Sequence, residues 1–310
     1  MSSTAGETVT PGRATATRPG VWLTDVTLVL MAIIWGVNFS VVKFGTTLVE
    51  PLAYNGLRVS LAAVVLVSIV SLGRASFPSR RDILALMALG VLGNGIYQYF
   101  FVQGIARTSA SDAALVVAAS PAFIAIISRL RGIERTGVRG VVGILLSVAG
   151  IACVVLGTTQ GAGDEGSGHS SLSGDLLVLC GSLAWAAYTV LLKPYTERVP
   201  GLQLSAFTMV GGALSLLLVA WPAVARANWS TVPLLGWGAV LYSGIFALVI
   251  AYLFWYRGVR VIGPTRTAMY SNLQPIIAVL VAWAMLGETP TIWQAVGAVS
   301  IMAGLVLTRA

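Results

Sequence analysis

The segment from Ala110 to Glu134 reads ASDAALVVAASPAFIAIISRLRGIE, and residues 264–288 read PTRTAMYSNLQPIIAVLVAWAMLGE. Each contains an apolar run of the length that crosses a bilayer, which takes roughly 20 residues. A shift of 154 residues superimposes Pro121 on Pro275 and Glu134 on Glu288. Two spans matched in this way indicate a membrane protein with an internal repeat.

The repeat extends in both directions from these two spans. The same shift pairs Gly104 with Gly258, Gly143 with Gly297 and Gly150 with Gly304, and a shift of 150 pairs Trp35 with Trp185. We therefore predict a first repeat over 25–157, a linker loop over 158–173 and a second repeat over 174–308. Because each repeat holds five apolar runs, the second is expected to enter the membrane from the opposite side, as in the inverted repeats of transporters.

The composition excludes a water-soluble protein. Hydrophobic residues make up 57% of the chain and charged residues 10%, whereas soluble domains hold about 25% charged residues. The apolar runs predict an all-α integral membrane protein with ten transmembrane helices. The expected spans are Asp25–Phe44, Pro51–Leu72, Ile83–Ile105, Ala110–Arg129, Val138–Gly157, Gly174–Leu192, Leu202–Trp221, Pro233–Tyr256, Thr265–Leu286 and Thr291–Thr308.

The distribution of basic residues predicts the orientation. If the N-terminus is cytoplasmic, 15 of the 19 Lys and Arg residues lie on the cytoplasmic side and three lie outside, as the positive-inside rule requires. Both termini are then cytoplasmic, and the linker 158–173, which has no Lys or Arg, is external. Residues 1–24 have the composition of a disordered cytoplasmic tail. The net charge of +8 reflects this topology, and we expect no nucleic-acid partner.

Several short motifs carry a family resemblance. They are Trp35-Gly36-Val37-Asn38-Phe39, Pro51 followed by Arg58, Thr108-Ser109-Ala110, Ser120-Pro121, Gln274-Pro275, Leu286-Gly287-Glu288 and Gly297 to Gly304. From about Asp25 to the C-terminus, in the right order in both halves, the chain resembles the EamA-like family of the drug/metabolite transporter (DMT) superfamily. One departure is Leu130-Arg131-Gly132-Ile133-Glu134, where the family has a Leu-Gly-Glu-like turn.

The resemblance implies a ten-helix transporter that works by alternating access around a central cavity. Its typical cargo would be amino acids, related metabolites, purines or drugs, and export from a bacterial cell through the inner membrane would be the commoner direction. Since one chain holds both halves of the cavity, we expect a monomer whose partners are the lipid bilayer and a small-molecule substrate.

The two prolines point to the position of the cavity. Proline inside a helix removes a backbone hydrogen bond, so Pro121 and Pro275 should kink their helices and free the carbonyls of Val117 and Ser271. Interrupted helices at matching places in two repeats favour a binding site, although a packing kink without ligand contact is the alternative.

Polar and aromatic side chains at helical spacing accompany these prolines. They are expected to line the cavity, because polar groups at membrane depth are costly unless they meet water or a partner; the alternative for about half of them is hydrogen bonding between helices. The candidates are Trp35, Asn38, Asn94, Tyr97, Gln98, Ser120, Trp185, Tyr188, Tyr242, Ser243, Tyr270 and Gln274.

Arg58 is the only basic residue expected well inside a span. It is either a carboxylate-binding or gating cation, or a structural residue paired with carbonyls or an acid. The acidic residues fall at the ends of predicted helices, which favours facilitated diffusion over proton antiport. Metal clusters and phosphate-binding loops are absent from the sequence, so we expect no metal and no cofactor.

Other function classes have less support. A membrane enzyme would need a catalytic constellation at one depth, and the sequence offers none; we therefore do not expect an enzyme. A channel would need repeated filter-like loops. Within transport, the alternative to amino acid export is efflux of aromatic or cationic drugs or of purines, because Trp and Tyr rings suit cation–π contacts.

Overall fold

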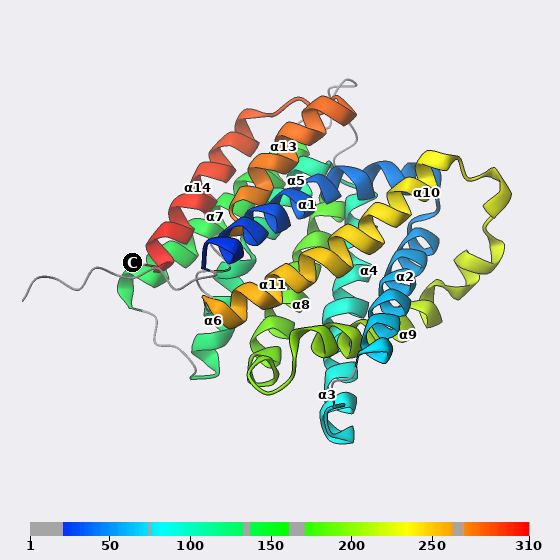
Figure 1. Cartoon of the computed structure of the whole chain (residues 1–310). Helices are drawn as coiled ribbons and strands as arrows, with labels where there is room; N and C mark the ends of the chain where they lie inside the picture. The colour runs from blue at the N-terminus through cyan, green and yellow to red at the C-terminus, as the bar shows by residue number, and fades with distance from the viewer. Residues whose placement is uncertain are drawn as a thin grey trace, which may run out of the picture.

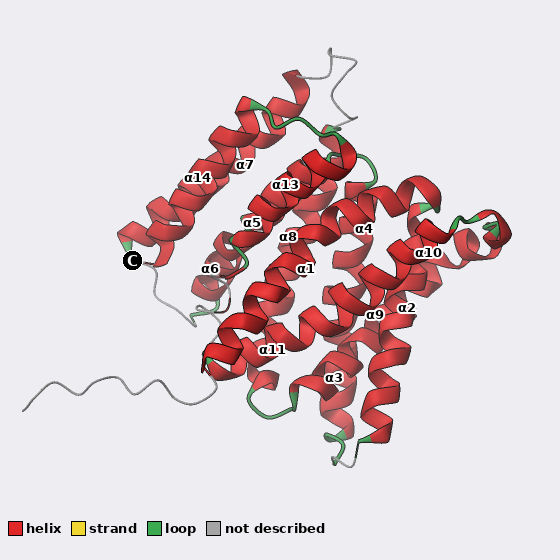
Figure 2. Cartoon of the chain, turned by 45° about the horizontal axis from the view of Figure 1, so that its top comes forward, coloured by secondary structure: helices red, strands yellow, loops and turns green. Residues whose placement is uncertain are grey.

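In the computed structural model of the protein, the described residues are 21–73, 76–132, 137–160, 171–262, 267 and 270–309, and every regular element among them is helical (Figure 2). The first half contains α1 (Val21–Leu48), α2 (Pro51–Leu72), α3 (Arg80–Gly90), the π-helix η1 (Val91–Ile96), α4 (Tyr97–Ile105), α5 (Ala110–Ala118), α6 (Ser120–Leu130) and α7 (Val138–Gln160). The second half contains α8 (Leu172–Thr196), α9 (Gly201–Arg226), the short 3-10 helix η3 (Trp229–Thr231), α10 (Leu234–Leu241), the π-helix η4 (Tyr242–Ile250), α11 (Ala251–Val261), α13 (Leu273–Leu286) and α14 (Ile292–Arg309).

The helices confirm a multi-pass membrane protein. By length and composition, eight helical segments of the described chain can cross a bilayer, from Trp22–Leu48 to Leu234–Gly258, and they match the first eight predicted spans. Two shorter apolar helices, Leu273–Leu286 and Ile292–Gly304, stand where the ninth and tenth spans were expected. The total of ten spans stays a prediction for those two.

The ends of the repeats differ slightly from expectation. Helix α1 begins at Val21, four residues inside the predicted tail, and α7 and α8 extend into the predicted linker as far as Gln160 and Leu172. Residues 1–20, 161–170 and Glu134 lie outside the described residues. Helix α1 begins and α14 ends toward the same end of the bundle, at the left of Figure 1.

Helix starts follow from local sequence. Pro51 occupies the first turn of α2, where its missing N–H costs nothing, and the Glu50 side chain accepts a hydrogen bond from Ala53 N at 2.9 Å. Ser109 caps α5 by accepting from Asp112 N at 2.9 Å. Such caps satisfy backbone donors that have no partner within the helix.

The two halves pack against each other along four pairs of helices. Helices α7 and α14 lie side by side at one edge of the bundle and α2 and α9 at the other, with α1 against α13 and α4 against α8 between them (Figure 1). The repeat-matched glycines allow close approach at the first edge, because a Cβ on Gly150 would lie 2.8 Å from Gly297 O. Small residues at such crossings are the usual basis of helix packing in membranes.

The helices are interrupted at matching places in the two halves. The third helical segment of each half contains a π-helix, η1 and η4, and the fourth is broken beside its proline, at Ala119 in the first half and at Ser271–Asn272 in the second. Irregular helix is frequent at functional sites.

Candidate functional site

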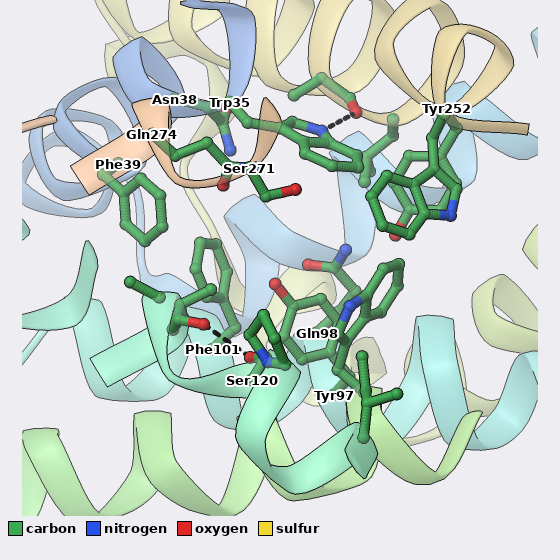
Figure 3. A pocket seen from close by; sticks show the side chains of 18 of the residues that line it. Trp35, Asn38, Phe39, Tyr97, Gln98, Phe101, Ser120, Tyr252, Ser271 and Gln274 are labelled. Atoms are coloured by element: carbon green, nitrogen blue, oxygen red, sulfur yellow. Dashed lines mark hydrogen bonds between the residues drawn. The ribbon is translucent and has the colours of Figure 1, made fainter. Parts of the chain in front are cut away.

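A cavity lies between the halves at these interruptions (Figure 3). It offers about 90 Å³ to the centres of water-sized molecules, several times the ~10–15 Å³ that one ordered water requires. Its lining consists of Trp35, Asn38, Phe39, Arg58, Tyr97, Gln98, Phe101, Val117, Ala118, Ser120, Pro121, Ile124, Trp185, Ala247, Leu248, Tyr252, Trp255, Ser271 and Gln274. The set is amphipathic, as ligand sites usually are.

Two walls face each other across the cavity. In Figure 3, Asn38 on α1 lies with Ser271 and Gln274 on one side, and Tyr97, Gln98 and Ser120 lie on the other. The first wall combines α1 of the first half with residues 271–274 of the second half, whereas the facing wall comes from α4 and α6 of the first half. The cavity therefore exists only when both halves are in place.

The prolines shape both walls. The Val117 carbonyl, which Pro121 leaves without its helical donor, accepts a hydrogen bond from Ser120 Oγ at 2.6 Å. The Ser271 carbonyl accepts from Gln274 N at 3.1 Å in a tightened turn. Both carbonyl-bearing residues line the cavity, so the chain satisfies the freed groups locally while it keeps them beside the open space.

An aromatic cluster forms part of the cavity lining. Trp35 donates from Nε1 to Ala247 O, 2.9 Å away in η4, and its ring meets Tyr252 edge-on with centroids 5.8 Å apart. Trp185 packs on Tyr97 at 5.1 Å and on Tyr252 at 5.9 Å. Contacts of this kind contribute beyond the area they bury, so four rings from α1, α4, α8 and α11 form one rigid apolar surface.

Arg58 provides the only formal charge in the lining. Its side chain is 0% exposed; Nε donates to Asn55 Oδ1 at 3.0 Å and Nη2 donates to Gln98 Oε1 at 2.5 Å. Both acceptors are neutral amides. Nη1 has no hydrogen-bond partner among the described residues, so the guanidinium remains positive and incompletely bonded at the cavity wall.

The structure brings together most of the predicted site residues but not all of them. Those that line the cavity are Trp35, Asn38, Arg58, Tyr97, Gln98, Ser120, Pro121, Trp185 and Gln274. Those that lie outside the lining are Asn94, Tyr188, Tyr242, Ser243, Tyr270 and Pro275. The five polar residues of the second group correspond to the alternative of hydrogen bonding between helices, and Pro275 corresponds to the alternative of a packing kink.

Specific partners explain why the second group lies outside. Tyr188 shares a 3.0 Å hydrogen bond with Tyr256, and Ser243 bonds the Tyr54 hydroxyl at 2.7 Å. The hydroxyls of Tyr242 and Tyr270 donate to Ile34 O at 3.2 Å and to Asp25 Oδ1 at 2.7 Å, and Asn94 Oδ1 accepts from Tyr252 at 3.3 Å. Pro275 is buried on α13. These side chains fix helix to helix instead of facing the open space.

Sequence reasoning missed Tyr252 and Trp255, which stand one helical turn apart on α11. The repeat itself contained the signal: the shift of 154 carries Gln98 onto Tyr252 and Phe101 onto Trp255. The same shift relates Val117 to Ser271 and Ser120 to Gln274. Transfer of the candidate Gln98 to the other half would have identified Tyr252, whereas Phe101, the repeat partner of Trp255, was not itself a candidate.

Glu288 closes one end of the bundle. Its carboxylate accepts from Ala110 N at 2.8 Å, from Ser111 N at 3.1 Å and from Ser111 Oγ at 2.7 Å. The acid thus caps a helix of the other half, where the exposed N–H groups and the helix dipole favour negative charge. We call these three hydrogen bonds the Glu288 clasp.

Further hydrogen bonds between the halves surround the clasp. Gln294 donates to Asp112 Oδ1 at 2.9 Å, and Thr108 donates to Asp175 Oδ1 at 2.5 Å. Within the first half, Lys43 Nζ donates to Thr108 O at 2.6 Å. This end, which we expect outside the cell, is therefore held together by polar contacts that a relative movement of the halves would have to break.

A bundle of apolar helices that encloses an amphipathic cavity between two matched halves defines a multi-pass membrane protein of the transporter class. The model of the EamA-like transporter family matches the chain twice, over residues 22–156 and 172–310. The chain belongs to the EamA-like transporter family. The two matches cover the two segments that the sequence analysis treats as repeats.

Individual relatives agree with this assignment. The chain is 28% identical to the uncharacterized transporter YyaM of Bacillus subtilis over 282 residues, which cover 90% of this chain and 91% of YyaM. It is 29% identical to the uncharacterized inner membrane transporter YedA of Escherichia coli K12 over 267 residues, covering 84% and 82% of the two chains. A crystal structure with 21% identity shares the fold, with a TM-score of 0.62 over 92% of this chain and 96% of the other.

Proposed function

We propose that the protein exports amino acids or related small metabolites across a bacterial inner membrane, as a monomer, by alternating access around the cavity. The observation that carries the proposal is the composition of the cavity lining, which contains both members of three repeat-related pairs: Gln98 and Tyr252, Val117 and Ser271, and Ser120 and Gln274. When both repeats contribute to one cavity, rocking of one repeat against the other can expose that cavity to either side of the membrane.

The pairing of helices supports the inverted repeat that this mechanism needs. Helix α1 packs on α13, and its counterpart α8 packs on α5 and α6; α1 also packs on η4 and α11, and α8 on η1 and α4. These pairings of one half recur with the halves exchanged. This is the pattern that two units related by a two-fold axis produce.

The Glu288 clasp supports a two-state mechanism. It joins the halves at one end by hydrogen bonds to a charged group, which are worth about 1.5–3 kcal/mol each. Contacts of this size hold one state closed and still allow another to be populated when substrate binds. In this proposal the structure represents a state closed at the clasp end.

The aromatic cluster favours cargo with a ring or another flat apolar part. Trp35, Trp185 and Tyr252 can stack on such a group, and aromatic amino acids, aromatic drugs and purines all offer one. The proposal therefore keeps efflux of aromatic drugs or purines as its second candidate.

Flux from preloaded proteoliposomes tests the proposal. We expect saturable efflux of an amino acid or related metabolite that is independent of an imposed pH gradient. Alanine at Asn38, Tyr97 or Gln274 should lower this flux with the protein still folded, whereas Tyr242→Phe, which changes a side chain outside the lining, serves as the matched control. No flux of any amino acid, metabolite, purine or drug would overturn the proposal, and flux that requires the gradient would overturn facilitated diffusion.

A further inference from the structure

The charge of the cavity lining is unbalanced. Arg58 is fully buried and its two hydrogen-bonded partners, Asn55 and Gln98, are neutral amides. The lining contains no Asp or Glu, and Arg58 forms no ion pair within the described part of the chain. A buried cation without a counter-ion is strongly disfavoured, so an anion or water must complete its environment.

The geometry indicates where that anion would bind. A guanidinium presents its donors in a planar fork that suits a carboxylate. Two of the three nitrogens of Arg58 donate hydrogen bonds, and the third, the buried Nη1, has no hydrogen-bond partner among the described residues, although Arg58 belongs to the cavity lining. The nearby rings of Tyr54 and Phe101 lie 5.9 and 5.8 Å from Arg58 Cζ, at the outer limit of a cation–π contact, and they do not neutralise the charge.

For a cationic ligand, the rest of the lining offers no group of opposite charge. Asn38 Oδ1 is a second buried atom without a partner, but as a neutral acceptor it supplies no negative charge. A ligand cation would meet the positive Arg58 in a low-dielectric space, where like charges repel strongly. The aromatic rings alone would have to offset that repulsion.

We propose that the cavity binds solutes through a carboxylate on Arg58, with an apolar or aromatic body against Trp35, Trp185 and Tyr252, and that it excludes cations. This inference rests on one part of the proposed function, namely that this cavity is the substrate-binding site. It removes cationic drugs from the candidate cargo and retains amino acids and simple carboxylic acids, which share the carboxylate.

Binding to the purified full-length protein in nanodiscs, measured by calorimetry, tests the charge requirement with a matched series. Hydrocinnamate carries the carboxylate, hydrocinnamamide is its neutral counterpart, phenethylamine carries only an ammonium group, and phenylalanine carries both charges. We expect the amide and the amine to bind about 10- to 100-fold more weakly than hydrocinnamate, the ratio that a charge-assisted hydrogen bond supplies.

Binding of phenylalanine shows whether the carboxylate belongs to an amino acid or to a simple carboxylic acid. Tighter binding of phenylalanine than of hydrocinnamate supports the proposal with an amino acid as the cargo. The reverse order supports it with a simple carboxylic acid. Phenethylamine binding as tightly as hydrocinnamate would overturn the proposal.

Variants show whether Arg58 is responsible. Arg58→Gln should abolish the preference for acid over amide and Arg58→Lys should keep part of it, while Arg226→Gln removes an arginine outside the cavity and should change nothing. Gln98→Glu places a carboxylate beside Arg58 and should shift the preference from hydrocinnamate toward phenethylamine; it decides the question if Arg58→Gln does not fold. An unchanged acid preference in Gln98→Glu would refute the assignment.

The experiments distinguish a failure of the carboxylate site from a failure of the proposed transport function. Preferential binding of hydrocinnamate without flux in proteoliposomes would overturn transport and leave the carboxylate site standing. Flux of solutes without any preference for a carboxylate would overturn the carboxylate site alone.

Discussion

Removal of the Glu288 carboxylate should open the end of the bundle that it closes. In Glu288→Ala, the N–H groups of Ala110 and Ser111 and the Ser111 hydroxyl lose their acceptor, at 2.8, 3.1 and 2.7 Å in the protein. Loss of an N-cap costs about 0.5–2 kcal/mol, and hydrogen bonds to a charged group are worth about 1.5–3 kcal/mol each but do not add.

These values predict a loss of about 2–3 kcal/mol from the closed state. Since 1.4 kcal/mol is a factor of ten, the ratio of closed to open molecules falls by about 30- to 150-fold. Glu288→Gln keeps one oxygen acceptor and loses the charge. It should give an intermediate shift.

The rate at which a reagent labels a cysteine in the cavity measures the ratio of closed to open molecules. The two free cysteines, Cys153 and Cys180, are replaced by alanine, and a single cysteine is introduced at Ala118, which lines the cavity. A maleimide that does not cross the membrane is added on the clasp side. Its reaction rate should rise by tens of fold in Glu288→Ala.

Glu50→Ala is the matched control. Glu50 also caps a helix, but it accepts from Ala53 of its own helix, so its loss weakens α2 locally and leaves the halves joined. An unchanged labelling rate in Glu288→Ala, or an equal rise in Glu50→Ala, would show that the clasp does not hold this end closed.

Two further predictions concern the cavity and the packing. Ala118→Trp fills the cavity and should lower flux at least tenfold without loss of folded protein, whereas Ala149→Trp, at an exposed position of α7, should leave flux unchanged; equal flux in both would remove the cavity from the transport path. Gly90→Ala would place a Cβ 1.9 Å from Thr208 O and should lower stability by about 1–3 kcal/mol through overpacking. Gly238→Ala meets nothing within 4 Å and should raise it by about 0.5–1 kcal/mol, because alanine favours helix. Thermal unfolding in detergent measures both shifts in Tm, and a Gly90→Ala protein as stable as the wild type would contradict the close approach of α3 and α9.

The internal repeat predicts which residues line the cavity better than residue type does. Tyr242 and Tyr252 are both tyrosines of one predicted span, and only Tyr252 lines the cavity. The shift from Gln98 singles out Tyr252, because related positions of two matched units occupy related places around a shared axis. Residue type alone could not separate them, since both hydroxyls find hydrogen-bond partners.

The sequence also could not predict which face of a helix some residues occupy. The π-helices η1 and η4 each insert extra residues per turn, so the face on which Asn94 or Ser243 lies cannot be counted from a regular 3.6-residue repeat. Both residues fall within these segments and both lie outside the cavity lining. Tyr97 and Gln98, which follow η1 directly, line it.

The sequence by itself determined that the chain is a multi-pass membrane protein, placed its apolar helices and its interrupting prolines, and identified the family. Hydrophobicity over a span and the chemistry of proline are local properties, so they can be followed along one dimension. The tertiary structure alone decided which polar residues share the cavity and that Glu288 caps a helix of the other half. It alone also showed that Arg58 Nη1 has no hydrogen-bond partner among the described residues. These facts depend on how two distant segments rotate and pack against each other, and no local property of the sequence encodes that arrangement.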